Sequence, residues 1–203
     1  MNGDDGSLIG VLVDDHRRLG DLLVRLAARG PARGRLVGEM TDELLRHVVA
    51  EELYLYPAVR EVVPEWAVDS TQHVDHDARV ERILADLSVT KPDSHAFDVL
   101  ITRLIVESRQ ALLHEEQEVF PLLAQHADGR LLADLGNMFQ AFSDVAGVER
   151  TCGTGRVVRF HGLVLHRWEP DLGADAEPFA DRLVAVQDGR SQRDPTPYLS
   201  LPA

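Results

Sequence analysis

Apolar residues recur at three- and four-residue steps through most of the first 145 positions, which is the period of a helix with one buried face. Breaks rich in Pro and Gly separate the periodic stretches. Pro57 lies inside the second stretch and predicts a kink there. Helices are expected over about residues 7–27, 36–63, 69–87 and 94–125, with a shorter amphipathic fifth over 131–145 that can cap an open end of a bundle. The pattern therefore predicts an all-α fold.

The C-terminal part follows a different pattern. Residues 156–168 alternate partly between apolar and polar side chains, as strands do, and Pro170 and Pro178 interrupt the chain afterwards. We expect residues 1–149 to form the helical domain and residues 150–203 an extension of β or irregular structure and unknown role. Three alternatives remain open for this extension: a hairpin, a disordered segment, or a docking arm. Such an arm could bind the bundle, a second copy of the chain or a partner.

Each of the four long stretches places histidine or glutamate among its inward apolar positions. His47 and Glu51 are four residues apart, so both side chains point to one face a turn apart. A buried imidazole or carboxylate without a partner is costly, whereas a metal ion satisfies its charge and lone pairs. The expected metal ligands are His16, His47, Glu51, His73, His76 and Glu115. A mixed shell of this kind suits iron, with manganese or zinc as competitors.

These residues carry a family resemblance. His16, the His47-x-x-x-Glu51 pair before Tyr-Leu-Tyr-Pro, His76, and the run Leu-Leu-His-Glu-Glu-Gln-Glu-Val-Phe-Pro resemble a hemerythrin-like HHE cation-binding domain over about residues 8–148. The resemblance implies an up-and-down four-helix bundle that holds a non-haem di-iron centre by histidines and carboxylates. Such proteins bind O₂, sense oxygen, NO or iron, or decompose peroxide. We therefore expect this protein to hold non-haem iron, with two ions favoured over one.

The second half departs from the family pattern at one position. Tyr-Pro at Pro57 and Phe-Pro at Pro121 align the two halves of the domain. Counting back ten residues from Pro57 gives His47, and the same count from Pro121 gives Ala111. The histidine expected in the second half is therefore an alanine, although Glu115 matches its counterpart.

Two substitutes for the missing histidine can be considered. His73, one turn before His76, is the first candidate. His114 is the second candidate and forms its own i,i+4 pair with Glu118. Because His114 stands about 100° around the helix from Glu115, His114 and Glu118 are less certain ligands. Either substitute would allow the centre to bind two metal ions. If neither histidine is a ligand, the centre would hold one iron firmly and a second weakly.

The amino-acid composition limits the kinds of partner that this chain is expected to bind. The chain has 21 Lys and Arg against 34 Asp and Glu, for a net charge of −13, and no basic cluster with interleaved aromatics, which disfavours nucleic acid and anionic membranes. The lone Cys152 can form no internal disulfide, and neither a signal peptide nor a spanning helix is recognisable. We therefore expect a soluble, cytoplasmic protein.

Three function classes remain. A binding or sensing protein, which we favour slightly, would take O₂ or NO at an open iron position. An enzyme would turn over peroxide or oxidise Fe(II) with a proton donor such as Tyr54, Tyr56, Glu115 or Glu118, although packing is the preferred role of the tyrosines. The alternative is a metal-poor interaction module that lost its metal together with the second-half histidine.

Overall fold

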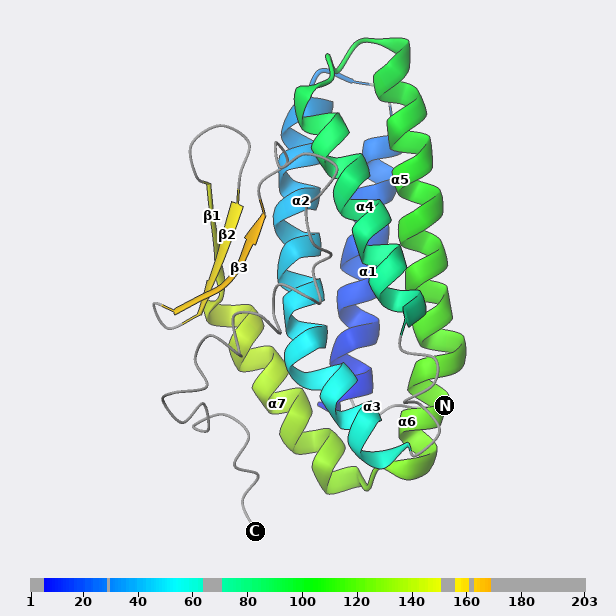
Figure 1. Cartoon of the computed structure of the whole chain (residues 1–203), viewed down its shortest axis with the longest axis vertical. Coiled ribbons are helices and arrows are strands. Elements are labelled where there is room, and N and C mark those ends of the chain that lie inside the picture. The colour runs from blue at the N-terminus through cyan, green and yellow to red at the C-terminus, as the bar shows by residue number, and fades with distance from the viewer. Residues whose placement is uncertain (1–5, 29, 64–70, 151–155, 161–162, 169–203) are drawn as a thin grey trace.

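Four long helices lie side by side and alternate in direction, as Figure 1 shows. The structure is a computed structural model that describes residues 6–28, 30–63, 71–150, 156–160 and 163–168. The long helices are α1 (Leu8–Ala27), α2 (Arg33–Ala50), α4 (Thr71–Val89) and α5 (His95–His114). Contacts join α1 to α2, α2 to α4, α4 to α5 and α5 back to α1, so the four helices enclose one core. The expected up-and-down four-helix bundle is confirmed.

Side-chain caps explain where three helices begin. The Ser7 hydroxyl accepts a hydrogen bond from the backbone N–H of Gly10 at the start of α1, as the sequence predicts. Ser94 caps α5 in the same way. Asp128 caps α7 (Gly129–Val145), which begins two residues earlier than the periodicity alone predicts.

The kink expected at Pro57 is a widened turn of π-helix, and the second half repeats it. The π segments are η1 (Glu51–Leu55) and η3 (Glu115–Val119), followed by the short helices α3 (Tyr56–Val62) and α6 (Phe120–His126). In each segment the N–H after its last residue bonds the carbonyl five residues back, that of Glu51 or Glu115. The prolines that follow have no N–H to donate, so the helix accommodates them by widening. A glutamate therefore opens each π segment.

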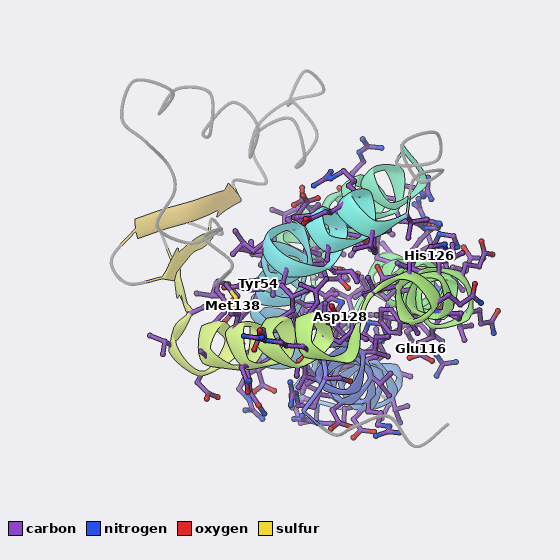
Figure 2. All side chains as sticks on the ribbon, turned by 90° about the horizontal axis from the view of Figure 1, so that it is seen from below. Tyr54, Glu116, His126, Asp128 and Met138 are labelled. Carbon is purple, nitrogen blue, oxygen red and sulfur yellow. The ribbon has the colours of Figure 1, made fainter. Side chains whose placement is uncertain are left out.

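Helix α7 closes one end of the bundle. Figure 2, seen from below, shows α7 lying across that end. Phe139 and Phe142 are buried and pack edge-on against Tyr54, with ring centroids 6.3 and 6.1 Å away. The short fifth helix thus contributes aromatic side chains to the core under the π segment η1.

Gly136 lets α7 approach the start of α1, and its replacement tests that contact. A Cβ at this position would lie 2.2 Å from the Gly6 carbonyl oxygen and 2.7 Å from the Ser7 carbonyl carbon, both backbone atoms. We expect Gly136→Ala to lower the free energy of unfolding by about 1–3 kcal/mol. Gly20→Ala, in helix α1 with nothing within 4 Å, should instead raise it by about 0.5–1 kcal/mol. Urea denaturation of both variants checks the contrast, and equal effects would contradict it.

A small sheet follows the helices. Strands β1 (Gly147–Arg150), β2 (Arg156–Phe160) and β3 (Leu163–Trp168) form an antiparallel sheet in chain order, with an irregularity between Val158 and Arg159. Of the alternatives left open for residues 156–168, the structure therefore has the hairpin. Strand β1 crosses the expected boundary at 149/150, and α2 contacts β1 and β2. The Pro-rich end of the expected extension lies outside the described residues. No described helix is long and apolar enough to cross a membrane.

Candidate metal centre

Four buried side chains from four helical segments meet inside the bundle. His16 comes from α1, His47 from α2, and Glu51 and Glu115 from the first residues of the two π segments. Each is at most 5% exposed, and one potential ligand atom from each lies within 4.8 Å of all the others. Donors that bind one ion at about 2.0–2.2 Å lie no more than about 4.4 Å apart, so a small contraction would let all four reach a single cation.

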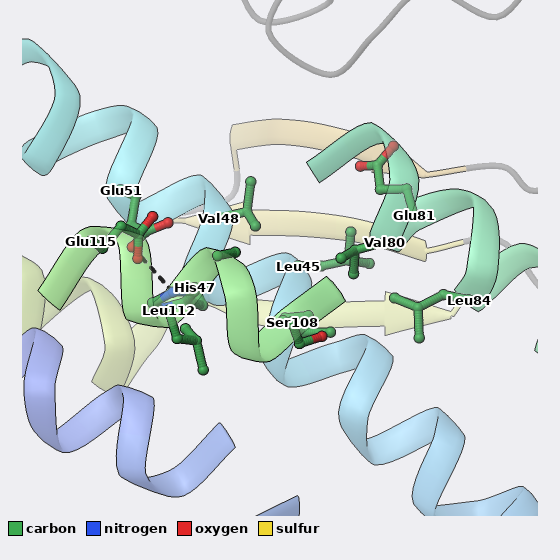
Figure 3. A pocket seen from close by; sticks show the side chains of 12 residues that line it. Leu45, His47, Val48, Glu51, Val80, Glu81, Leu84, Ser108, Leu112 and Glu115 are labelled. Carbon is green, nitrogen blue, oxygen red and sulfur yellow. Dashed lines mark ion pairs between the residues drawn. The ribbon is translucent and has the colours of Figure 1, made fainter. Parts of the chain in front are cut away.

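The distances describe a tight arrangement of imidazole nitrogens and carboxylate oxygens. His47 Nε2 lies 3.1 Å from Glu51 Oε1, the pair drawn as a dashed line in Figure 3. His16 Nε2 lies 3.2 Å from Glu115 Oε2 and 3.9 Å from Glu51 Oε1. The Glu51 carboxylate therefore stands between the two imidazoles.

Three of these atoms have no hydrogen-bond partner among the described residues. They are His16 Nε2, Glu51 Oε1 and Glu115 Oε2, and each is fully shielded from solvent. Buried polar atoms without a hydrogen bond are costly, and here they face one another at ion-pair distances. A cation between them would satisfy all three, so the residues present fit a bound metal, and their imidazole and carboxylate donors fit iron.

Three further polar atoms of the cluster are held by residues outside it. His47 Nδ1 pairs with Asp15 Oδ2 at 2.7 Å, and His16 Nδ1 with Glu116 Oε1 at 2.9 Å. An Nδ1–H that donates to a carboxylate leaves the Nε2 lone pair free for a metal. Tyr56 donates its hydroxyl proton to Glu115 Oε1 at 2.8 Å, which directs Oε2 toward the cluster. All three contacts therefore orient a donor atom inward.

The electrostatics of the cluster favour protonated imidazoles when no metal competes. Burial opposes charge on His16, yet the carboxylates of Glu115 and Glu51 raise its pKa to about 9. Against the same burial penalty, Glu51 and Asp15 raise the pKa of His47 well above its ordinary value. Burial also opposes ionisation of Glu51, but His47 and His16 lower its pKa to about 2. Burial and the neighbouring charge of Glu51 raise the pKa of Glu115.

Two other predicted ligands, His76 and His114, make contacts outside the cluster. His76 is half-buried on α4, where its Nδ1 lies 2.9 Å from Arg79 Nη2 and 3.7 Å from Glu107 Oε2. The described cluster does not include it. His114 Nδ1 lies 3.5 Å from Glu118 Oε2, and the Glu118 side chain is 66% exposed, so this pair faces solvent. The side chain of His73 lies outside the described residues.

Sequence reasoning missed the outer partners. Asp15 and Glu116 each lie next to a cluster residue along the chain, and only the packing of the helices shows which imidazole each one meets. The helical period does place Asp15, three residues after Leu12 and four before Leu19, on the apolar stripe, and it leaves the exposed Asp14 off that stripe. Tyr56, assigned to packing, is buried and also contacts a cluster carboxylate.

Removing the charge of Asp15 should weaken metal binding. We expect Asp15→Asn to lower iron affinity about 10–100-fold, because outer carboxylates orient a ligating imidazole and raise its basicity. Competition with a coloured chelator measures the change. Asp14→Asn is the matched control, since Asp14 is exposed and its carboxylate pairs with Arg17 on the same helix, away from the cluster. Equal affinities of the two variants would refute the role of Asp15.

Comparison with known proteins agrees with this geometry. The sequence matches the family model of the hemerythrin HHE cation binding domain over residues 7–123, more than half of the chain. The matched range contains the four cluster residues and both π segments and ends before α7. Searches of the curated proteins and of the solved structures found no match. The chain therefore belongs to the hemerythrin HHE cation-binding domain family.

Proposed function

We propose that this protein binds non-haem iron through His16, His47, Glu51 and Glu115, and that the iron binds or senses a small ligand such as O₂ or NO. The observation that carries the proposal is the convergence on one point of three buried donor atoms that lack a hydrogen bond among the described residues and face one another at ion-pair distances. Two imidazoles and two carboxylates suit iron, with manganese and zinc as competitors.

One ion is the form that the cluster supports best. Its four donor atoms lie within the span of a single coordination shell. A second ion would draw on the same carboxylates and on His76 or His73 from α4. Because the Arg79 guanidinium lies 2.9 Å from His76 Nδ1, its positive charge opposes a cation there, and we infer weaker binding of the second ion.

The chain's own groups would prepare the centre for a ligand. Bound iron would supply an open coordination position and a change of oxidation state. Asp15 and Glu116 hold the two imidazoles, Tyr56 holds Glu115, and the Phe120 ring packs 5.4 Å from the ring of His16. Burial keeps water away from these donors, which favours reversible binding.

Peroxide handling is the second candidate. The Tyr56 hydroxyl supports it, because this buried proton donor lies 2.8 Å from Glu115 Oε1. Absorption spectra after mixing with O₂, NO or peroxide separate the two functions, since stable adducts indicate binding and repeated peroxide loss indicates turnover.

Metal content tests the proposal first. We expect elemental analysis of protein purified without a metal-chelating tag to give close to one iron per chain, with a second ion lost on dialysis. Absence of iron after anaerobic Fe(II) loading would refute the proposal and leave the metal-poor interaction module in its place.

A further inference from the structure

A narrow pocket adjoins the candidate centre between α2, α4 and α5. His47, Glu51 and Glu115 line one end, and Ser108 and Leu84 lie toward the other, as Figure 3 shows. The volume of this pocket is about 30 Å³. One water needs about 10–15 Å³ on this measure, so the pocket has room for two or three heavy atoms.

Ala111 leaves this space open. It lines the pocket together with His47, its counterpart in the first half of the domain. A methyl group here takes the place of an imidazole, so the pocket occupies volume that a ligating side chain would fill. The pocket is therefore open because the second half of the domain has alanine at the position where the first half has His47.

Ser108 gives the pocket a polar end. The residue is 3% exposed, and its Oγ has no hydrogen-bond partner among the described residues. A hydroxyl in a helix commonly bonds the carbonyl four residues earlier, as Thr41 bonds Val37 O at 2.8 Å. Ser108 lacks even this local bond, so a hydroxyl that can both donate and accept is left at the pocket wall.

The remaining walls disfavour an anion. Leu45, Val80 and Leu112 are among the apolar residues that line the pocket, and Glu81 is an acidic one. An anion would meet these apolar walls and the carboxylates of Glu51, Glu81 and Glu115, which is unfavourable. An uncharged molecule with one hydrogen-bonding atom satisfies both the walls and Ser108.

We propose that this pocket binds an uncharged ligand of two or three heavy atoms beside the metal centre, with Ala111 providing the room and Ser108 the hydrogen bond. Ser108 in α5 and Glu115 at the start of η3 are seven residues apart, about 10 Å along the helix axis, and both line the pocket. A ligand bonded to Ser108 therefore reaches the centre through the pocket. The proposal rests on the proposed iron site, and it adds the place and chemical class of the ligand.

Nitric oxide is the probe, because it is uncharged, has two heavy atoms and forms a coloured complex with Fe(II). We expect Ala111→Leu, which fills the pocket, to lower the NO affinity of the Fe(II) protein at least about tenfold while iron content stays unchanged. Ser108→Ala should lower it about threefold to tenfold, as expected for one lost hydrogen bond. Val106→Leu on the same helix, 48% exposed, is the matched control and should bind NO as the original protein does.

The outcomes separate this proposal from the iron site. If Ala111→Leu fails to fold or loses iron, the smaller Ala111→Val replaces it, with circular dichroism and iron content as checks. Pocket variants that hold iron and bind NO with unchanged affinity would overturn the pocket proposal alone and assign water to the space. An original protein that takes up no iron would overturn the iron site and this proposal together.

Discussion

Replacing Glu51 by alanine is expected to remove most of the bound iron. Glu51 Oε1 lies 3.1 Å from His47 Nε2 and 3.9 Å from His16 Nε2, so this carboxylate stands between both imidazoles. Its loss would remove a donor and a negative charge from a buried site, and we expect iron affinity to fall by more than about 100-fold, beyond the effect of losing an outer partner. His47→Ala should act similarly. Elemental analysis after dialysis measures the iron retained per chain.

The matched control is Glu118→Ala. Glu118 opens no π segment, its side chain is 66% exposed, and it pairs with His114 away from the cluster. This variant should retain its iron. The same measurement tests whether the His114–Glu118 pair, the less certain ligands suggested by the sequence, contributes to iron binding. An iron-replete Glu51→Ala protein would contradict the assignment of the centre.

Iron affinity should rise steeply with pH. Metal ligation needs neutral imidazoles, but the pKa of His16 is raised to about 9 and that of His47 well above 6.5. Below these values each imidazole must release a proton on binding, which adds up to a factor of about ten per pH unit for each histidine. Between pH 6 and 8 we expect affinity to increase about 10²–10⁴-fold. Chelator competition at both pH values measures this, and equal affinities would show that the imidazoles are neutral before binding.

The metal-free protein should respond to pH in the opposite sense. A raised pKa means that His16 contributes stability fully below pH 6.5, and that this contribution is lost as pH rises through about 9. Ionised Glu51, with its pKa lowered to about 2, contributes above pH 4.5 and loses its contribution as pH falls toward 2. The raised pKa of Glu115 also reduces stability as pH rises above 4.5. Urea denaturation of metal-free protein should therefore give lower stability at pH 9 than at pH 6, and bound iron should reverse this order.

The helical fold and the inward positions of the cluster could be predicted from local pattern. Apolar residues at helical spacing determine which face of each helix is buried, and His16, His47, Glu51 and Glu115 lie on those faces whatever the exact crossing of the helices. The half-repeat before Pro57 and Pro121 also identified Ala111, which lines the pocket.

Only the tertiary structure decided which polar groups meet. His76 shares the inward stripe of its helix in the sequence, yet it lies with Arg79 and Glu107, because the rotation and axial offset of α4 are set by packing with α2 and α5. Asp15, Glu116 and Tyr56 contact their partners across 32, 100 and 59 residues of sequence. A one-dimensional pattern reports the face on which a side chain lies, whereas its partner depends on how neighbouring helices slide and turn against one another.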